Sequence, residues 1–133
     1  MRKSAGNFDV VRTVGREFSD LEESTAYGSP ALKLGMQLVA CLAIHSSAEP
    51  GSLVVRTSFE ERAALLTEDP ETYYLTDHYL KHPVVLARLA RLNTDQLRDL
   101  LAAARRCILA DAKARRSGTS RRDQGLRSRK GNG

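Results

Sequence analysis

The order of apolar patterns along the chain predicts an α+β fold: a two-layer sandwich in which a mainly antiparallel sheet of about five strands carries terminal helices on one face. Near both ends, apolar residues recur every three to four positions, the period of a helix buried on one side. Between them, short apolar runs are joined by connections of hairpin length, which link antiparallel strands. A chain of 133 residues with 41% hydrophobic residues can bury one core.

The first half of the chain is expected to contain one helix and three strands. An apolar stripe predicts a helix of about 7–18, in which Gly15 permits close packing against a neighbouring element. Residues 19–30 hold many Ser, Glu and Gly residues and are interpreted as a loop. The three strands are expected at 31–34, 38–44 and 53–56, with turns at 35–37 and 50–51.

The second half is expected to contain two helices and two strands. The elements are a short helix that ends near Thr67, a strand at 72–75, a segment at 84–92 and a helix that ends near Ala112. Both helices begin at a capping box, formed by Ser58 with Glu61 and by Asn93 with Gln96. The segment 84–92 fits both a helix and a strand, and its β-branched start slightly favours a strand.

The net charge of +5 is concentrated at the end of the chain. Residues 113–133 carry eight basic and one acidic residue, 8 − 1 = +7, so the other 112 residues sum to −2. With almost no apolar residue, this segment cannot bury enough surface to fold by itself. We therefore expect a domain at 1–112 and a basic, disordered tail at 113–133, the start of which can continue the preceding helix.

Several classes of protein are excluded or disfavoured. No apolar run is long enough for a membrane span, and the N-terminus lacks the apolar stretch of a secretory signal, so we expect a soluble cytoplasmic protein with no membrane partner. Cys41 and Cys107 are 66 positions apart, lie in apolar segments and are expected to be buried thiols. His78 and His82 have the spacing of a metal pair on a helix, which Pro83 opposes, so we expect no metal and no cofactor.

The segment 69–89 holds three of the four tyrosines and two of the three histidines. Pro70 and Pro83 give it an irregular backbone, and polar or aromatic side chains on such connections are often placed for contact. The alternative is that these tyrosines only cap a small core. The sequence leaves both interpretations open.

Four motifs follow one another along the chain: EESTAYGSPALKL, EERAALL, DPETYYLTDHYLKHPVVLARLARL and DQLRDLLAAARR. In these motifs and their order the chain resembles the MmcQ/YjbR family, from about Phe8 to Arg106. The resemblance implies a frataxin-like (CyaY-like) fold, a strand at 84–92, and DNA binding. In such folds iron binds acidic groups near the first helix; here these acids are interspersed with Arg12 and Arg16, which favours a solvated face. The basic tail is not part of the family pattern.

Nucleic-acid binding is therefore the leading functional prediction. Basic and aromatic side chains on a sheet can contact phosphates and stack on bases. The tail at 113–133 would act as a basic arm, which adds affinity that does not depend on the nucleotide sequence. The predicted contacts are Lys33, Arg56, Tyr73, Tyr74, Arg88 and Arg91 on the sheet and Arg115, Arg116, Arg121 and Arg122 on the tail.

The alternative is a small-ligand or protein-interaction domain whose pocket lies between the YGSP and TDHYLKHP segments. Its expected residues are Tyr27, Lys33, His78, Tyr79 and His82, which requires the two segments to meet in space. An enzyme is less favoured, because no nucleophile motif, phosphate-binding loop or metal triad accompanies the acid–base groups. The sequence does not indicate an oligomeric state.

Overall fold

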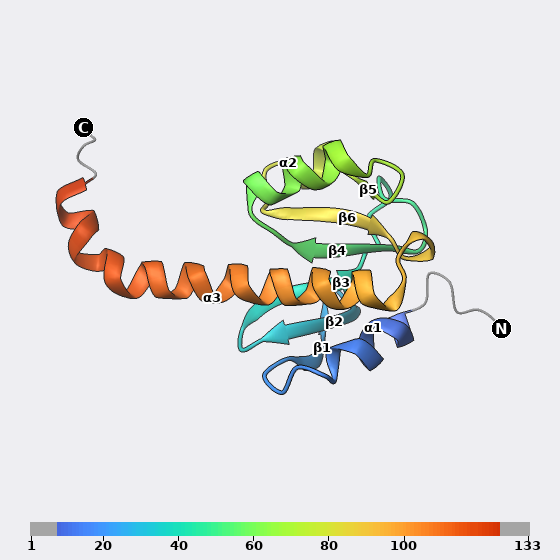
Figure 1. Ribbon diagram of the computed structural model, residues 1–133, viewed down its shortest axis with the longest axis horizontal. Coiled ribbons are helices and arrows are strands. Elements are labelled where there is room, and N and C mark those ends of the chain that lie inside the picture. Colours follow the sequence, from blue (N-terminus) through green and yellow to red (C-terminus); the bar gives the residue numbers. More distant parts are fainter. Residues whose placement is uncertain (1–7, 126–133) are drawn as a thin grey trace.

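The computed structural model describes residues 8–125, with side chains described up to Arg116, and shows an α+β two-layer fold (Figure 1). The elements are α1 (Phe8–Gly15), β1 (Glu22–Ala26), β2 (Ser29–Leu34), β3 (Gln37–Leu42), β4 (Ser52–Arg56), α2 (Phe59–Glu68), β5 (Tyr73–Tyr74), η1 (Asp77–Tyr79), β6 (Val84–Arg88), η2 (Leu89–Arg91) and α3 (Thr94–Gly125). The predicted fold class is confirmed.

The strands form one sheet in the order β1-β2-β3-β4-β6-β5, and every neighbouring pair is antiparallel. Helix α3 runs across one face of the sheet and packs against β3, β4 and α1 (Figure 1). Helix α1 also contacts β2, and α2 packs beside β5 and β6. The opposite face has no α-helix over it among residues 8–125.

Strand register sorts the side chains onto the two faces. On the helix-covered face Leu32, Val55 and Val85 belong to the main core together with Leu97 and Leu101 of α3. The neighbouring residues point the other way, as alternation in a strand requires. They form a row of paired positions across the sheet, Ala31–Cys41–Val54–Leu86–Tyr74, which belongs to a second, smaller apolar cluster.

Two local predictions about the helices are confirmed. Asn93 and Gln96 make a reciprocal capping box, with amide-to-side-chain distances of 2.9 and 2.7 Å. A Cβ added to Gly15 would lie 2.8 Å from Cδ1 of the buried Leu32, so glycine allows α1 to approach β2 closely. The Ser58 hydroxyl accepts a hydrogen bond from the Glu61 amide at the start of α2.

The prediction of a loop at 19–30 is wrong, because this segment contains β1 and the start of β2. Four of the five β1 residues are exposed, so the strand has no apolar alternation that a sequence pattern could show. Tyr27 and Gly28 join the two strands with φ angles of 55° and 79°, the sign that a two-residue hairpin turn of type I′ requires at both positions. The sheet therefore has six strands rather than about five.

Two boundaries also differ from expectation. The strand expected at 84–92 ends at Arg88 and is followed by the short helix η2, which places Arg91 outside the sheet. Helix α3 continues past Ala112 to Gly125, because residues 113–125 contain no proline to interrupt it. The first part of the expected disordered tail is therefore helical, and residues 126–133 lie outside the described residues.

Candidate functional site

The open face of the sheet carries a pocket of about 610 Å³. Its floor is formed by strand residues of the smaller apolar cluster, including Leu38, Cys41, Val54 and Val84. Its rim is formed by Ala26, Tyr27, Ser29, Leu42, Ala43, Ile44, His45, His78, Tyr79, His82 and Pro83. Pockets of this volume and largely apolar character hold small molecules in many proteins.

The pocket brings together four of the five residues predicted for the alternative site. Tyr27 of the YGSP segment and His78, Tyr79 and His82 of the TDHYLKHP segment all line it. Lys33 does not line it and lies on β2, opposite Glu22 of β1. The two segments therefore meet at one site, although their role there stays a prediction.

His45 is a site residue that the sequence analysis missed. Its ring stacks on that of His78, with centroids 3.5 Å apart and planes 12° apart. Tyr79 packs edge-on against both rings, at 4.7 Å from His78 and 6.2 Å from His45. His45 follows the end of β3 and belongs to no motif, so only its position after an apolar strand could have drawn attention to it.

Arg62 of α2 holds the loop that carries His78 and His82. The side chain is 8% exposed and donates hydrogen bonds to the carbonyl oxygens of Leu80, His82 and Val84, at 2.8 to 3.2 Å. Its guanidinium also lies 4.7 Å from the ring centroid of Phe59. Because one buried guanidinium bonds three carbonyls of the segment 80–84, this arginine gives the irregular loop a defined conformation.

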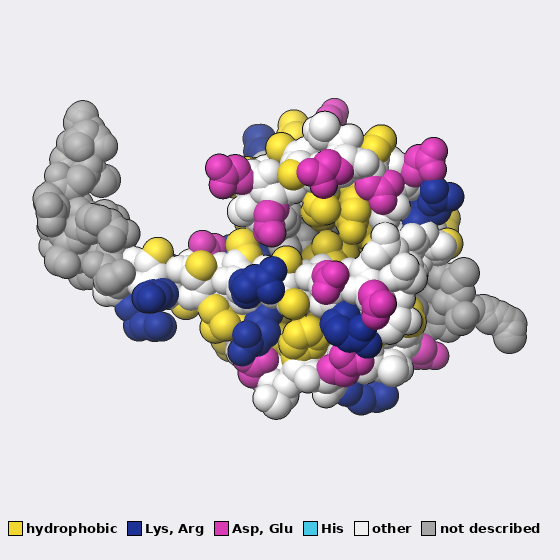
Figure 2. Space-filling view, viewed as in Figure 1, with side chains coloured by type: hydrophobic (Ala, Val, Ile, Leu, Met, Phe, Trp, Pro, Cys, Tyr) yellow, Lys and Arg dark blue, Asp and Glu magenta, His cyan; other side chains and the backbone are white. Residues whose placement is uncertain are grey.

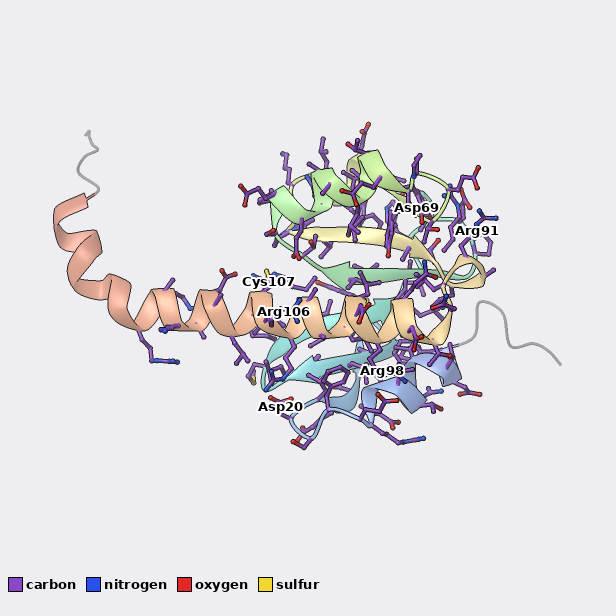
Figure 3. All side chains as sticks on the ribbon, in the orientation of Figure 1. Asp20, Asp69, Arg91, Arg98, Arg106 and Cys107 are labelled. Atoms are coloured by element: carbon purple, nitrogen blue, oxygen red, sulfur yellow. The ribbon has the colours of Figure 1, made fainter. Side chains whose placement is uncertain are left out.

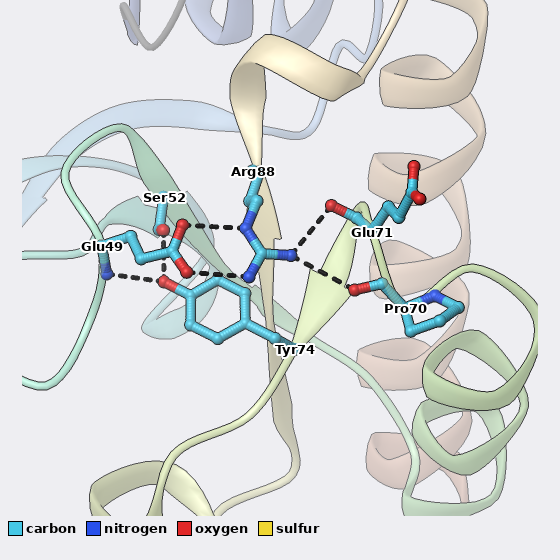
Figure 4. A network of polar contacts seen from close by, with 6 residues as sticks. All are labelled: Glu49, Ser52, Pro70, Glu71, Tyr74 and Arg88. Atoms are coloured by element: carbon cyan, nitrogen blue, oxygen red, sulfur yellow. Dashed lines mark hydrogen bonds and ion pairs between the residues drawn. The ribbon is translucent and has the colours of Figure 1, made fainter.

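A second network holds the loop that carries His45 (Figure 4). Arg88 donates two hydrogen bonds of 2.8 Å to the carboxylate of Glu49 and further bonds to the carbonyl oxygens of Pro70 and Glu71. The Tyr74 hydroxyl accepts from the Glu49 amide and bonds the Ser52 hydroxyl. The β3–β4 connection is thereby tied to β5 and β6.

The two loops are also joined directly. The hydroxyls of Ser47 and Thr76 are 2.8 Å apart, and the Ser47 amide donates to Nδ1 of His45 at 3.0 Å. His45 and His78 therefore stack between two loops that are each anchored to the sheet. Such anchoring places the imidazoles before any ligand arrives.

The pocket is electrostatically neutral apart from its imidazoles. Of the described residues that line it, none is Asp, Glu, Lys or Arg. Burial raises the pKa of the Cys41 thiol and of the Tyr79 hydroxyl, so both stay protonated at neutral pH. Desolvation, together with nearby His45 and His82, lowers the pKa of His78.

The residues predicted for a nucleic-acid-binding sheet do not form one surface. Arg56 forms an ion pair with Asp111 of α3, on the helix side of the sheet, and Arg91 forms one with Glu71. Arg88 is engaged in the network with Glu49 and lies 4.3 Å from the ring centroid of Tyr74. Tyr73 is buried in the main core because its strand position faces the helices, so it offers no ring for a base.

The predicted arm residues lie on the last part of α3, which projects away from the body of the domain (Figures 1 and 2). Arg115 and Arg116 are exposed there, and the side chains of Arg121 and Arg122 lie beyond the described ones. Figure 2 views the helix-covered side, on which basic and acidic side chains alternate and no histidine is visible.

The acidic residues near α1 are engaged with arginines of the helices. Glu17 accepts from Arg98 at 2.6 Å, and Asp20 accepts from Arg105 at 2.9 Å. Figure 3 labels Arg98 and Asp20, on the side of the molecule where α1 lies. These hydrogen bonds lower the pKa of both carboxyl groups. In the part of the chain that the structure describes, no group of three or more His, Cys, Asp or Glu residues could hold a metal ion.

Comparison of the chain with protein-family models, curated proteins and solved structures finds no match. The resemblance to the MmcQ/YjbR family therefore stays a prediction from the sequence motifs. Within residues 8–125, none of the helices combines the length and the apolar character that crossing a membrane requires.

Proposed function

We propose that this protein binds a small, largely apolar ligand in the open-face pocket. The observation that carries the proposal is the pocket itself: about 610 Å³, with a floor of strand side chains and a rim that includes His45, His78 and Tyr79. Ligand sites commonly combine such an apolar wall with a few polar groups that orient the ligand.

The anchoring of both rim loops supports this proposal. Arg62 fixes the loop of His78, and the Arg88–Glu49 network fixes the loop of His45. A loop that is already ordered loses little conformational entropy when a ligand binds. The exposed side chains of Tyr27 and Ile44 at the rim, 86% and 61% exposed, can close over a bound molecule.

The test is a titration with decan-1-ol, a neutral apolar probe, followed by ¹H–¹⁵N NMR spectra. We expect shifts that saturate and cluster on residues of the floor and rim. Ala43→Trp adds bulk to the pocket wall and should weaken binding at least about tenfold, whereas Ala110→Trp, at an exposed position on α3, should not. Shifts scattered over the whole surface, or equal effects of the two variants, would contradict the proposal.

A second candidate function is nucleic-acid binding through the basic arm. It is supported by the charge of +7 in residues 113–133, by the projection of α3 from the domain, and by the family resemblance. The sheet arginines Arg56, Arg88 and Arg91 are each paired with a carboxylate, so they are less available for phosphate contacts. Its binding would be electrostatic and largely independent of sequence.

A cytoplasmic location also stays a prediction.

The arm is tested with two variants of equal net charge in the full chain. Arg115→Gln with Arg116→Gln should reduce the slope of log affinity for duplex DNA against log salt by about 2, since each phosphate contact contributes about 0.9. The matched control, Arg91→Gln with Arg106→Gln, changes exposed arginines of the body. An equal loss in the control would mean that the arm has no special part, and no DNA binding at low salt would exclude this function.

A further inference from the structure

We infer that the ligand of the open-face pocket is an amphipathic anion, whose apolar part lies on the sheet and whose carboxylate lies at the three histidines of the rim. This inference rests on the proposed small-ligand function and specifies the class of ligand. It makes binding proton-linked, because an imidazole that faces an anion is stabilised in its charged form.

The distribution of histidine in the chain is the first argument. The full sequence contains three histidines, and all three line this one pocket. They come from different segments: His45 follows β3, His78 lies on η1, and His82 precedes β6. Structural histidines that only satisfy local hydrogen bonds have no reason to gather at the rim of one cavity.

The charges around the rim are the second argument. No Asp or Glu is among the described residues that line the pocket, so the pocket itself presents no carboxylate to a bound anion. The Ser47 amide donates to Nδ1 of His45, which places that ring's proton on Nε2 as a donor. The neighbouring groups of His78 are His45, His82 and the Tyr79 ring, with Asp77 and Lys81 flanking it along the chain.

The stacked rings provide the coupling between ligand and proton. Two imidazoles with centroids 3.5 Å apart repel each other if both are charged, and this repulsion adds to desolvation, the larger cause, in lowering the pKa of His78. An anion bound beside them offsets this repulsion. By linkage, the anion favours uptake of a proton and the proton favours binding of the anion.

The apolar floor supplies the rest of the specificity. Leu38, Val54 and Val84 offer no hydrogen-bonding side chain, so a fully polar anion such as phosphate gains nothing from them. A molecule with a hydrocarbon or aromatic body satisfies both parts of the site. Decanoate is a suitable probe, because its carboxylate stays ionised above about pH 5.

The experiment compares decanoate with decan-1-ol and decylamine, below their micelle concentrations, by calorimetry at pH 8 and pH 5.5. We expect decanoate to bind about tenfold more tightly at pH 5.5 than at pH 8, because a lower pH favours the charged form of imidazole, and decan-1-ol to show no such gain. Calorimetry in buffers of different ionisation enthalpy should show proton uptake with decanoate. The imidazole signal of His78, followed by NMR, should titrate at higher pH when decanoate is bound.

Two variants locate the effect. His78→Gln should flatten the pH dependence of decanoate binding, because it removes one imidazole from the stacked pair. Arg106→Gln removes one positive charge from an exposed position on α3 and should leave the pH dependence intact. A loss in both variants would assign the effect to overall charge and would overturn the inference.

The remaining outcomes separate the inference from the function on which it rests. Equal pH profiles for decanoate and decan-1-ol, or tighter binding of decylamine at pH 5.5, would contradict the inference that the ligand is an anion. The proposed small-ligand pocket would still stand. If none of the three probes binds in the pocket, the proposed function and this inference both fail.

Discussion

The two faces of the sheet use the same strands for different purposes. On the helix-covered face, Leu32, Val55 and Val85 are almost completely buried beneath α1 and α3. On the open face the neighbouring row, Ala31, Cys41, Val54 and Leu86, is also buried, but no α-helix covers it among the described residues. The covered face is closed by α1 and α3, whereas the open face is bordered by the loops that carry His45 and His78, which leaves room for a pocket.

The largest expected difference between the faces is in stability. Leu101→Ala removes a fully buried side chain between α3 and the sheet and should lower the free energy of unfolding by about 2–5 kcal/mol. Leu38→Ala removes the same atoms from the half-buried wall of the pocket and should cost about 1 kcal/mol. Urea denaturation measures both. Equal losses would mean that the open face contributes to the core as the covered face does.

A smaller effect is expected at the loop over the pocket. Arg62→Leu removes a donor from the carbonyls of Leu80, His82 and Val84 and should lower stability by about 1–2 kcal/mol. The NMR signals of His78 and His82 should also shift and broaden as the loop loses its order. Arg62→Lys keeps one charged donor and should lose less. Sharp, unshifted histidine signals in Arg62→Leu would show that the loop keeps its conformation without Arg62.

The smallest expected effect is a difference between the two faces in how their contributions to stability depend on pH. Arginine hydrogen bonds lower the pKa of Glu17 and Asp20, so their contribution is complete above the ordinary carboxyl pKa near 4 and is lost as the pH falls further. His78 also has a lowered pKa, so the unfolded chain takes up its proton first and stability declines as the pH falls below about 6.5.

Stability measured from pH 8 to pH 3 should therefore show two ranges of loss. Glu17→Gln should reduce the change below about pH 5, and His78→Gln should reduce the change between about pH 7 and pH 5. Added salt should weaken the first effect more, because the pairs of Glu17 and Asp20 lie at the surface. A single range, unchanged in both variants, would contradict this division of the two faces.

The sequence by itself determined the features that depend on neighbours in the chain. The class of the fold, both terminal helices, the capping box of Asn93 with Gln96 and the use of Gly15 could all be predicted, because helix period, caps and turns are local. The meeting of the Tyr27 and His78 segments was an expectation that the pocket agrees with. This expectation rested on the YGSP and TDHYLKHP motifs, and not on the periodicity of apolar residues.

Only the tertiary structure decided which side chains meet across the sheet. Strand β1 is an edge strand held by pairing with β2, so its own exposed sequence shows no pattern. His45 and His78 stack, and Arg62 reaches the loop of His82, only because antiparallel pairing and helix packing bring distant segments together. Such contacts depend on sheet order and register, which single side chains do not encode. Strand pairing and helix packing also bring Arg56 to Asp111 and Arg88 to Glu49, carboxylates that lie far from these arginines in the chain.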